Sequence, residues 1–209
     1  MKRIFIALGL VFALQTAMVA QLTDTAQVIF RAHLLKTFNL NIVSGPSQDI
    51  TFSTAANYNT GVIEGAGVSP GTTNITIEAT GNWNLKISAP NFVPYAGPNG
   101  AGSGTIAINN LGVWLAATGT HQFGTEISCP YVSLASALGL STSDAILIGL
   151  LTINSGDITD NAFTLHWQMG QATACPLMNQ ATMFDQLALG LFGPGDFTST
   201  ATLTLTEIP

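Results

Sequence analysis

The sequence predicts an all-β protein, built as an antiparallel β-sandwich of about ten strands. Two observations lead to this prediction. Apolar residues recur at every second position in many short segments, whereas the periodicity of amphipathic helices is scarce. Turn-forming residues separate these segments, and the chain has 21 Gly and 9 Pro among its 209 residues. Since 47% of the residues are hydrophobic, a disordered chain is excluded.

The first 20 residues have the pattern of a secretory signal peptide. A basic start, Lys2-Arg3, precedes an unbroken apolar run over residues 4–14, which is too short to span a bilayer. We expect cleavage after Ala20 and a single β-sandwich domain over residues 21–209. No later run reaches about 18 uncharged apolar residues, so no transmembrane segment is expected. The mature chain is therefore predicted to be secreted, in the extracellular space or on the outer cell surface.

Few charged residues cover the surface of the exported chain. Charged side chains make up 8% of the sequence, against about 25% in ordinary soluble domains. After cleavage, three cationic side chains remain against 11 acidic ones; they are Arg31, Lys36 and Lys86. This balance gives no electrostatic basis for binding nucleic acid or an anionic membrane. A neutral surface rich in hydroxyl groups is typical of extracellular β proteins and of subunits that pack against copies of themselves.

The longest alternating segment begins at Val28. Every second residue is apolar, with an interruption at Lys36, and the apolar positions are Val28, Phe30, Ala32, Leu34, Phe38, Leu40 and Ile42. This period of two predicts one long strand, or two strands in register with a bulge or a change of sheet near Lys36.

Further strands follow at short intervals along the chain. They are expected at residues 50–52, 73–80, 83–89, 105–109, 111–117, 125–129, 146–153 and 162–169. The Gly81-Asn82 pair between two alternating segments predicts a β-hairpin. Turns are expected over residues 55–70, an exposed loop over 91–104, and a short helix or turn over 132–140 and 178–191. A final strand is expected over residues 197–207, with an apolar face and a face of threonines.

The chain contains two cysteines, Cys129 and Cys175. An exported chain with an even number of cysteines most simply forms one disulfide bond in an oxidising compartment. Closing a loop of about 47 residues contributes about 4 kcal/mol in the chain-entropy model. Metal binding by two isolated cysteines is the poorer alternative.

Two glycine-rich motifs resemble functional loops. Gly67-Val68-Ser69-Pro70-Gly71 matches the nucleophile elbow of hydrolases, but Pro70 lacks the backbone N–H that would help to form the oxyanion hole. A surface turn is therefore favoured. Residues 97–104 lack a following helix and a phosphate-binding lysine, so a flexible connector is favoured over a nucleotide loop. The sequence accordingly predicts no catalytic and no cofactor-binding residues.

Candidate metal ligands are scattered along the chain. The histidines, His33, His121 and His166, do not have the spacing of a local zinc site. Asp157 and Asp160 lie in a compact acidic turn that offers some oxygen ligands for Ca²⁺, but a solvated turn is the favoured interpretation. No metal site is predicted.

A resemblance to a family rests on four features. They are the export leader, the alternating amino-terminal segment, the Trp83-Asn84-Leu85 segment and the closing Gly195-Asp196-Phe197 segment. With these features the chain resembles the secreted immunoglobulin-like β-sandwiches of Gram-negative cell surfaces, which include pilin and fimbrial subunits. The resemblance implies polymerisation by strand donation, in which an amino-terminal strand, here within residues 26–43, completes the sheet of the next subunit.

The side chains that such a donor strand would insert are Val28, Phe30, Ala32 and Leu34. In the alternative interpretation this segment is the first strand of its own fold. We therefore expect a non-enzymatic structural subunit of a cell-surface filament, pilus or matrix, with adhesion as an allied role and copies of itself as partners.

The alternative function is a monomeric carbohydrate- or cell-wall-binding module with a surface glycan as its ligand. Exposed tryptophan would distinguish this module, because sugars stack on aromatic rings. Trp83, Trp114 and Trp167 all lie at apolar strand positions, so positions in the core are favoured for all three.

Overall fold

The computed structural model describes residues 31–32, 34–63, 71–170 and 177–209. Lys36–Pro209 forms one compact unit, and the residues up to Leu35 belong to a separate unit. The described strands are β1 (Phe38–Ser44), β2 (Val62–Ile63), β3 (Thr72–Ala79), β4 (Trp83–Ser88), β5 (Val93–Pro94), β6 (Ser103–Gly104), β7 (Leu111–Ala117), β8 (Ile127–Ser128), β9 (Leu138–Gly139), β10 (Ala145–Leu150), β11 (Ala162–Met169), β12 (Phe192–Gly193), β13 (Phe197–Thr198) and β14 (Thr202–Glu207). The described helices are α2 (Ala55–Thr60), α3 (Met183–Ala188) and two 3₁₀ turns, Ile108–Asn110 and Leu134–Ser136.

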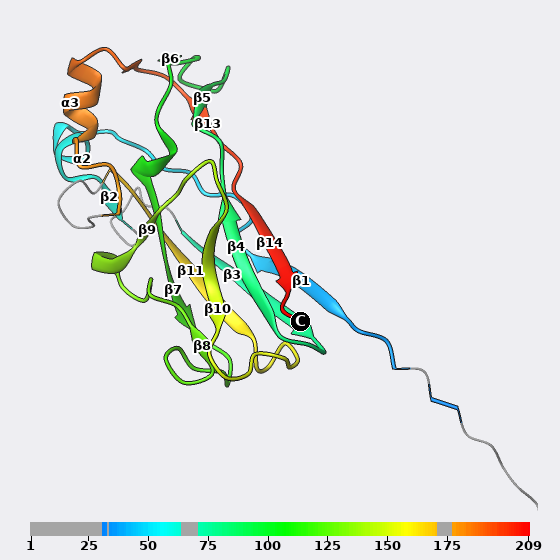
Figure 1. Ribbon diagram of the computed structural model, residues 1–209. Helices are drawn as coiled ribbons and strands as arrows, with labels where there is room; N and C mark the ends of the chain where they lie inside the picture. The colour runs from blue at the N-terminus through cyan, green and yellow to red at the C-terminus, as the bar shows by residue number, and fades with distance from the viewer. Residues whose placement is uncertain (1–30, 33, 64–70, 171–176) are drawn as a thin grey trace, which may run out of the picture. The chain divides into compact units, whose positions relative to one another are not determined.

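Two antiparallel sheets form the body of the compact unit (Figure 1). The first sheet has the strand order β1-β3-β11-β7-β9, with β2 also paired to β11, and the second has the order β14-β4-β10-β8. Two short ladders, β12-β6 and β13-β5, lie at the end that carries α2 and α3 (Figure 1). The predicted all-β, antiparallel sandwich is confirmed.

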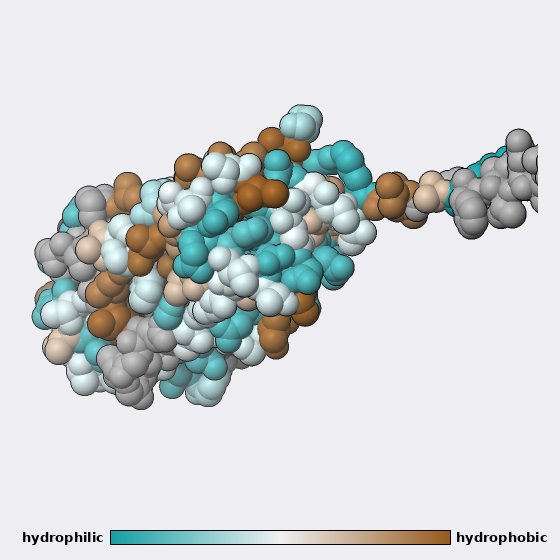
Figure 2. Space-filling view, turned by 90° about the horizontal axis from the view of Figure 1, so that it is seen from below, coloured by the Kyte–Doolittle hydropathy of each residue, from teal (hydrophilic) through white to brown (hydrophobic). Residues whose placement is uncertain are grey.

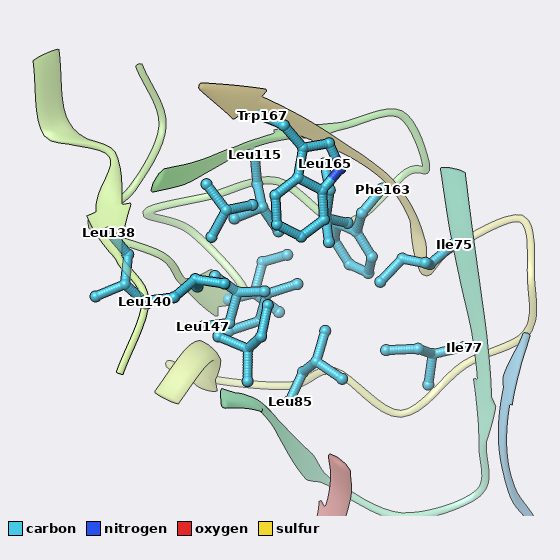
Figure 3. Close-up of a cluster of buried hydrophobic side chains, with 14 of the residues drawn as sticks. Ile75, Ile77, Leu85, Leu115, Leu138, Leu140, Leu147, Phe163, Leu165 and Trp167 are labelled. Atoms are coloured by element: carbon cyan, nitrogen blue, oxygen red, sulfur yellow. The ribbon is translucent and has the colours of Figure 1, made fainter. Parts of the chain in front are cut away.

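The core lies between the two sheets. Strand β3 buries Ile75 and Ile77, while β4 buries Trp83 and Leu85. Figure 3 shows side chains from β3, β4, β7, β10 and β11 pointing toward one another in this layer. The alternation seen in the sequence therefore reports the inward face of each sheet.

The predicted hairpin around Gly81-Asn82 is wrong. Strand β3 pairs with β1 and β11, whereas β4 pairs with β14 and β10, so the two strands belong to different sheets. The turn carries the chain from one layer to the other. Both strands still bury alternate side chains in the shared core, which explains why their sequences alternate as those of a hairpin do.

Other predicted strands differ in their accuracy. The predictions over residues 111–117 and 162–169 coincide with β7 and β11. Residues 50–52 form no strand, and the predicted strand over 105–109 is replaced in part by the 3₁₀ turn Ile108–Asn110, whose first N–H donates to Asn91 Oδ1 at 2.9 Å. The predicted strand over 197–207 is split into β13, paired with β5, and β14, paired with β4.

The first strand is shorter than predicted. Strand β1 begins at Phe38, and the described residues from Arg31 to Thr37 are neither strand nor helix, so a single long strand is wrong for this part of the chain. The bulge lies between Ile42 and Ser44, not near Lys36. Phe38–Ser44 thus pairs with β3 of its own chain, whereas the described part of the predicted donor segment before it, including Ala32 and Leu34, forms no strand.

A buried polar contact anchors the turn between the sheets. Asn154 and Trp83 are both fully buried. Asn154 Oδ1 accepts from the Trp83 backbone N–H at 3.0 Å, Asn154 Nδ2 donates to the Trp83 carbonyl at 2.6 Å, and the Trp83 indole N–H donates to the Asn154 carbonyl at 2.6 Å. One asparagine side chain thereby satisfies both backbone polar groups of a core residue.

Replacing this side chain tests the contact. We expect Asn154→Ala to lower the free energy of unfolding by about 2 to 4 kcal/mol, because two buried backbone groups of Trp83 lose a partner. The matched control is Asn39→Ala, at an exposed position of β1, with an expected change within about 0.5 kcal/mol. Urea unfolding followed by circular dichroism measures both. Equal stability of the two variants would contradict this role of Asn154.

Candidate functional site

On one flank of the compact unit each sheet ends in an edge strand, β1 in the first sheet and β14 in the second. Within the described residues, β1 pairs only with β3 and β14 pairs only with β4, so each strand presents one free edge. The two edges lie side by side (Figure 1), and Lys36 forms an ion pair with Glu207 where β1 begins and β14 ends. Unpaired N–H and C=O groups along such edges are ready to pair with another strand.

A groove of about 500 Å³ opens on this flank beyond the ion pair. Its lining is mixed polar and apolar, and its buried or half-buried apolar residues, which we call the floor, include Ala89, Phe92, Leu111, Trp167 and Leu203. Its rim is richer in hydroxyl groups and comes from the loop after β1 and from the segment that joins β13 to β14, with Ser47, Asp49, Thr198, Ser199 and Thr200. We call this feature the flank groove.

A hydrogen-bond network holds the loop after β1 against the groove floor. Thr73 Oγ1 accepts from the Trp167 indole N–H at 3.0 Å and from Gln48 Nε2 at 3.1 Å, and it donates to the Gly45 carbonyl at 2.7 Å. Gln48 Nε2 also lies 3.2 Å from the Thr72 carbonyl. Gly45 has φ of 67°, and a Cβ atom there would lie 1.9 Å from that carbonyl oxygen, so only glycine fits.

Half of the predicted donor residues are described. Val28 and Phe30 lie outside the described residues. Ala32 and Leu34 are exposed, and the side chains of Leu34 and Leu35 have exposed fractions of 95% and 84%. Two consecutive leucines with this exposure are unusual, because such side chains are normally buried.

Cys129 is half-buried and forms no disulfide within the described residues, and burial raises the pKa of its thiol to about 11, against a smaller lowering by the backbone hydrogen bond from Tyr131. Cys175 lies outside the described residues. The disulfide between them stays a prediction.

The three tryptophans differ in their surroundings. Trp83 and Trp167 are buried, as predicted. Trp114 lies on the outer face of its sheet, not in the core, and stacks on His166 with ring centroids 3.8 Å apart. It also packs against Ala137 and Met178, which explains an apolar residue on this face.

The candidate metal ligands do not form a cluster in the described residues. No group of three or more His, Cys, Asp or Glu side chains there has the arrangement of a metal site, and His33 is not among the residues described. His121 Nδ1 lies 3.0 Å from Asn161 Oδ1. Hydrogen bonds from the Thr120 hydroxyl and the Asp157 backbone N–H hold the pKa of Asp160 below its usual value.

The loop over residues 97–104 is held by Asp196, a contact that the sequence does not predict. Asp196 Oδ2 accepts from the Asn99 backbone N–H and Oδ1 accepts from Asn99 Nδ2, both at 2.8 Å. Asp196 lies 97 residues after Asn99 in the sequence, so no local pattern indicates that the two side chains meet. Of the Gly67-Val68-Ser69-Pro70-Gly71 motif, only Gly71 lies within the described residues.

Comparisons with known proteins do not assign the chain to a family. No protein-family model matches the sequence, and no curated protein is significantly similar to it. The described part of the chain contains no helix with the length and hydropathy of a membrane span.

Removing the central hydroxyl of the network tests how the groove floor is held. We expect Thr73→Val to lower the free energy of unfolding by about 1 to 3 kcal/mol, because the buried Trp167 indole N–H loses its acceptor. Thr73→Ser keeps the hydroxyl and should lose only about 0.8 kcal/mol for one methyl group. Urea unfolding gives the stabilities, and NMR hydrogen exchange of the Trp167 indole proton should speed up only in Thr73→Val. Unchanged exchange in that variant would contradict the network.

Proposed function

We propose that this protein is a non-enzymatic, extracellular structural subunit that assembles into a cell-surface filament or matrix by β-strand pairing. The flank groove is the acceptor, and the amino-terminal segment of a second copy, with Val28, Phe30, Ala32 and Leu34 directed inward, is the donor. Adhesion belongs to the same proposal as a property of the assembled surface.

The observation that carries this proposal is the flank groove between two free strand edges. A strand that enters such a groove gains backbone hydrogen bonds along an edge and buries alternate side chains on the floor. The floor residues Phe92, Trp167 and Leu203 offer apolar contacts to those side chains. The groove therefore has the chemistry that an alternating strand requires.

The amino-terminal segment supports the same conclusion from the donor side. Its apolar residues alternate from Val28 to Leu34, which suits one buried and one exposed face. Leu34 is nearly fully exposed although its sequence pattern is that of a half-buried strand. Insertion into a neighbouring copy would bury the Leu34 side chain together with the other apolar side chains on the same face of the strand.

The sparse charge of the chain supports extracellular self-assembly. Only 8% of the residues are charged, and Figure 2 shows residues of hydrophilic or intermediate hydropathy over much of the visible described surface, with apolar residues in separate groups. The net charge of the chain is negative, but its charged residues are few. Copies of the chain that pack closely therefore meet little electrostatic repulsion. The apolar leader before Gln21 supports export of the chain.

The second candidate, a monomeric carbohydrate-binding module, rests on Trp114. Trp83 and Trp167 are buried, so Trp114 is the tryptophan with partial access to solvent. Its ring already stacks on His166 and packs against Met178, which leaves little ring surface for a sugar. This candidate therefore has weaker support.

Two adjacent leucines provide a matched test of strand donation. We expect Leu34→Asp to abolish assembly, because it would bury a carboxylate on the apolar groove floor, whereas Leu35→Asp should assemble normally because it faces outward. Envelope fractions are run on a denaturing gel with and without boiling, and a ladder that collapses on boiling reports strand-donated polymers. Both monomers should unfold at the same temperature, because both leucines are exposed.

Two results would count against strand donation. One is equal ladders in Leu34→Asp and Leu35→Asp, which would show that parity in this segment does not matter. The other is a monomer band in both lanes for the wild-type chain, which would favour the carbohydrate-binding module. Quenching of tryptophan fluorescence by glycans, lost in Trp114→Ala, would then support that module.

Export to an oxidising compartment also predicts the disulfide between Cys129 and Cys175. We expect Cys129→Ser and Cys175→Ser each to lower the free energy of unfolding by about 2 to 5 kcal/mol, and the double variant to lose no more than either single one. Urea unfolding of the exported protein and peptide mapping without reductant provide the measurements. A neutral Cys175→Ser variant would contradict the bond and leave Cys129 as a buried thiol.

A further inference from the structure

We propose that Arg31 of the inserted donor segment pairs with Asp49 on the rim of the flank groove, and that this ion pair selects the register of the donor strand. The inference rests on the proposed function, since it concerns two copies joined by strand donation.

The acceptor side offers one charged group. Asp49 is the only charged residue among the lining residues of the flank groove, and it is exposed. Within the described residues its carboxylate has no hydrogen-bond or ion-pair partner. A free carboxylate on the rim of a largely neutral groove attracts a cation on the strand that enters the groove.

The donor side offers one cation. Of the three cationic residues that follow the leader, Lys36 is paired with Glu207 and Lys86 lies on β4, outside the groove. Arg31 lies in the sequence between Phe30 and Ala32, two of the side chains that the proposed donor strand would insert; it is exposed and has no charged partner within the described residues. Arg31 is at an odd position and the apolar residues are at even positions, so in a strand they point to opposite sides. When the apolar side chains face the floor, Arg31 is therefore on the side of the rim.

The apolar alternation of the donor strand and its charged residue exclude different registers of that strand in the groove. A shift of the donor by one residue turns Val28, Phe30, Ala32 and Leu34 away from the floor, so alternation alone excludes it. A shift by two residues keeps the apolar face inward but moves Arg31 by about 7 Å along the groove, away from Asp49. The ion pair therefore distinguishes registers that the apolar pattern leaves nearly equivalent.

Charge exchange in the full exported chain tests this pair. We expect R31D alone and D49R alone each to raise the protein concentration needed for half-maximal assembly at least about fivefold at low salt, because like charges then meet on the rim. The double variant R31D/D49R should return to within about twofold of wild type, because the pair is restored in the opposite sense. Sedimentation velocity over a concentration series gives these values.

An equimolar mixture of the two single variants is the sharper test. Each donor in the mixture finds a matched acceptor on the other variant, so we expect the mixture to assemble as well as the double variant. The controls are K86D and E78R, which make the same changes of net charge on β4 and β3 outside the groove and should assemble as wild type does. In 0.5 M salt, at which screening is strong, the defects of the single variants should shrink.

The possible failures are distinguishable. Normal assembly of R31D and D49R, or no recovery in both the double variant and the mixture, would overturn the Arg31–Asp49 pair while strand donation stands. A wild-type chain that stays monomeric at every concentration would overturn the pair together with the proposed function.

Discussion

The turn at Gly81-Asn82 is the constraint on which the layered structure depends. Strand β3 enters it with Ile77 in the core, and β4 leaves it with Trp83 in the same core, although the strands belong to different sheets. Asn154 satisfies the backbone of Trp83, so the chain changes layer without unpaired polar groups at this residue. Strand β1 is added to β3, and β14 is added to β4. The turn thus also determines where the two free edges, and the flank groove between them, come to lie.

The sequence predicted which face of each strand is buried better than it predicted which strands pair with each other. Strands β7 and β11 match their predicted ranges because alternation marks one buried face directly. The same alternation occurs whether β3 and β4 form a hairpin or cross between layers, so pairing could not be deduced from it. Long-range contacts also determine where strands begin and end. The predicted strand over residues 197–207 is divided into β13 and β14 because β13 pairs with β5 and β14 pairs with β4.

The candidate site was less predictable because distant segments build it. The flank groove combines the loop after β1, Trp167 of β11 and the segment from Phe197 to Leu203, and no local spacing connects them. Trp114 shows a related limit, because Ala137 and Met178 cover it on the outer face of β7. A strand with apolar residues on both faces has no parity that separates core from surface. The residues proposed as donors were visible in the sequence because their alternation is local.

The composition of the two free edges gives them few charged residues that would oppose pairing with a further strand. Proteins that must stay monomeric usually protect an exposed edge with charged residues, proline or a pronounced bulge. Strand β1 carries no charged or proline residue, and β14 carries only Glu207, at its end. Strand β1 does carry one such protection, the bulge between Ile42 and Ser44 at its groove end, and the Lys36–Glu207 ion pair joins the two edges at the other end. One end of the flank is therefore tied together and the other is open, so the groove end is the place where the proposed strand addition would occur.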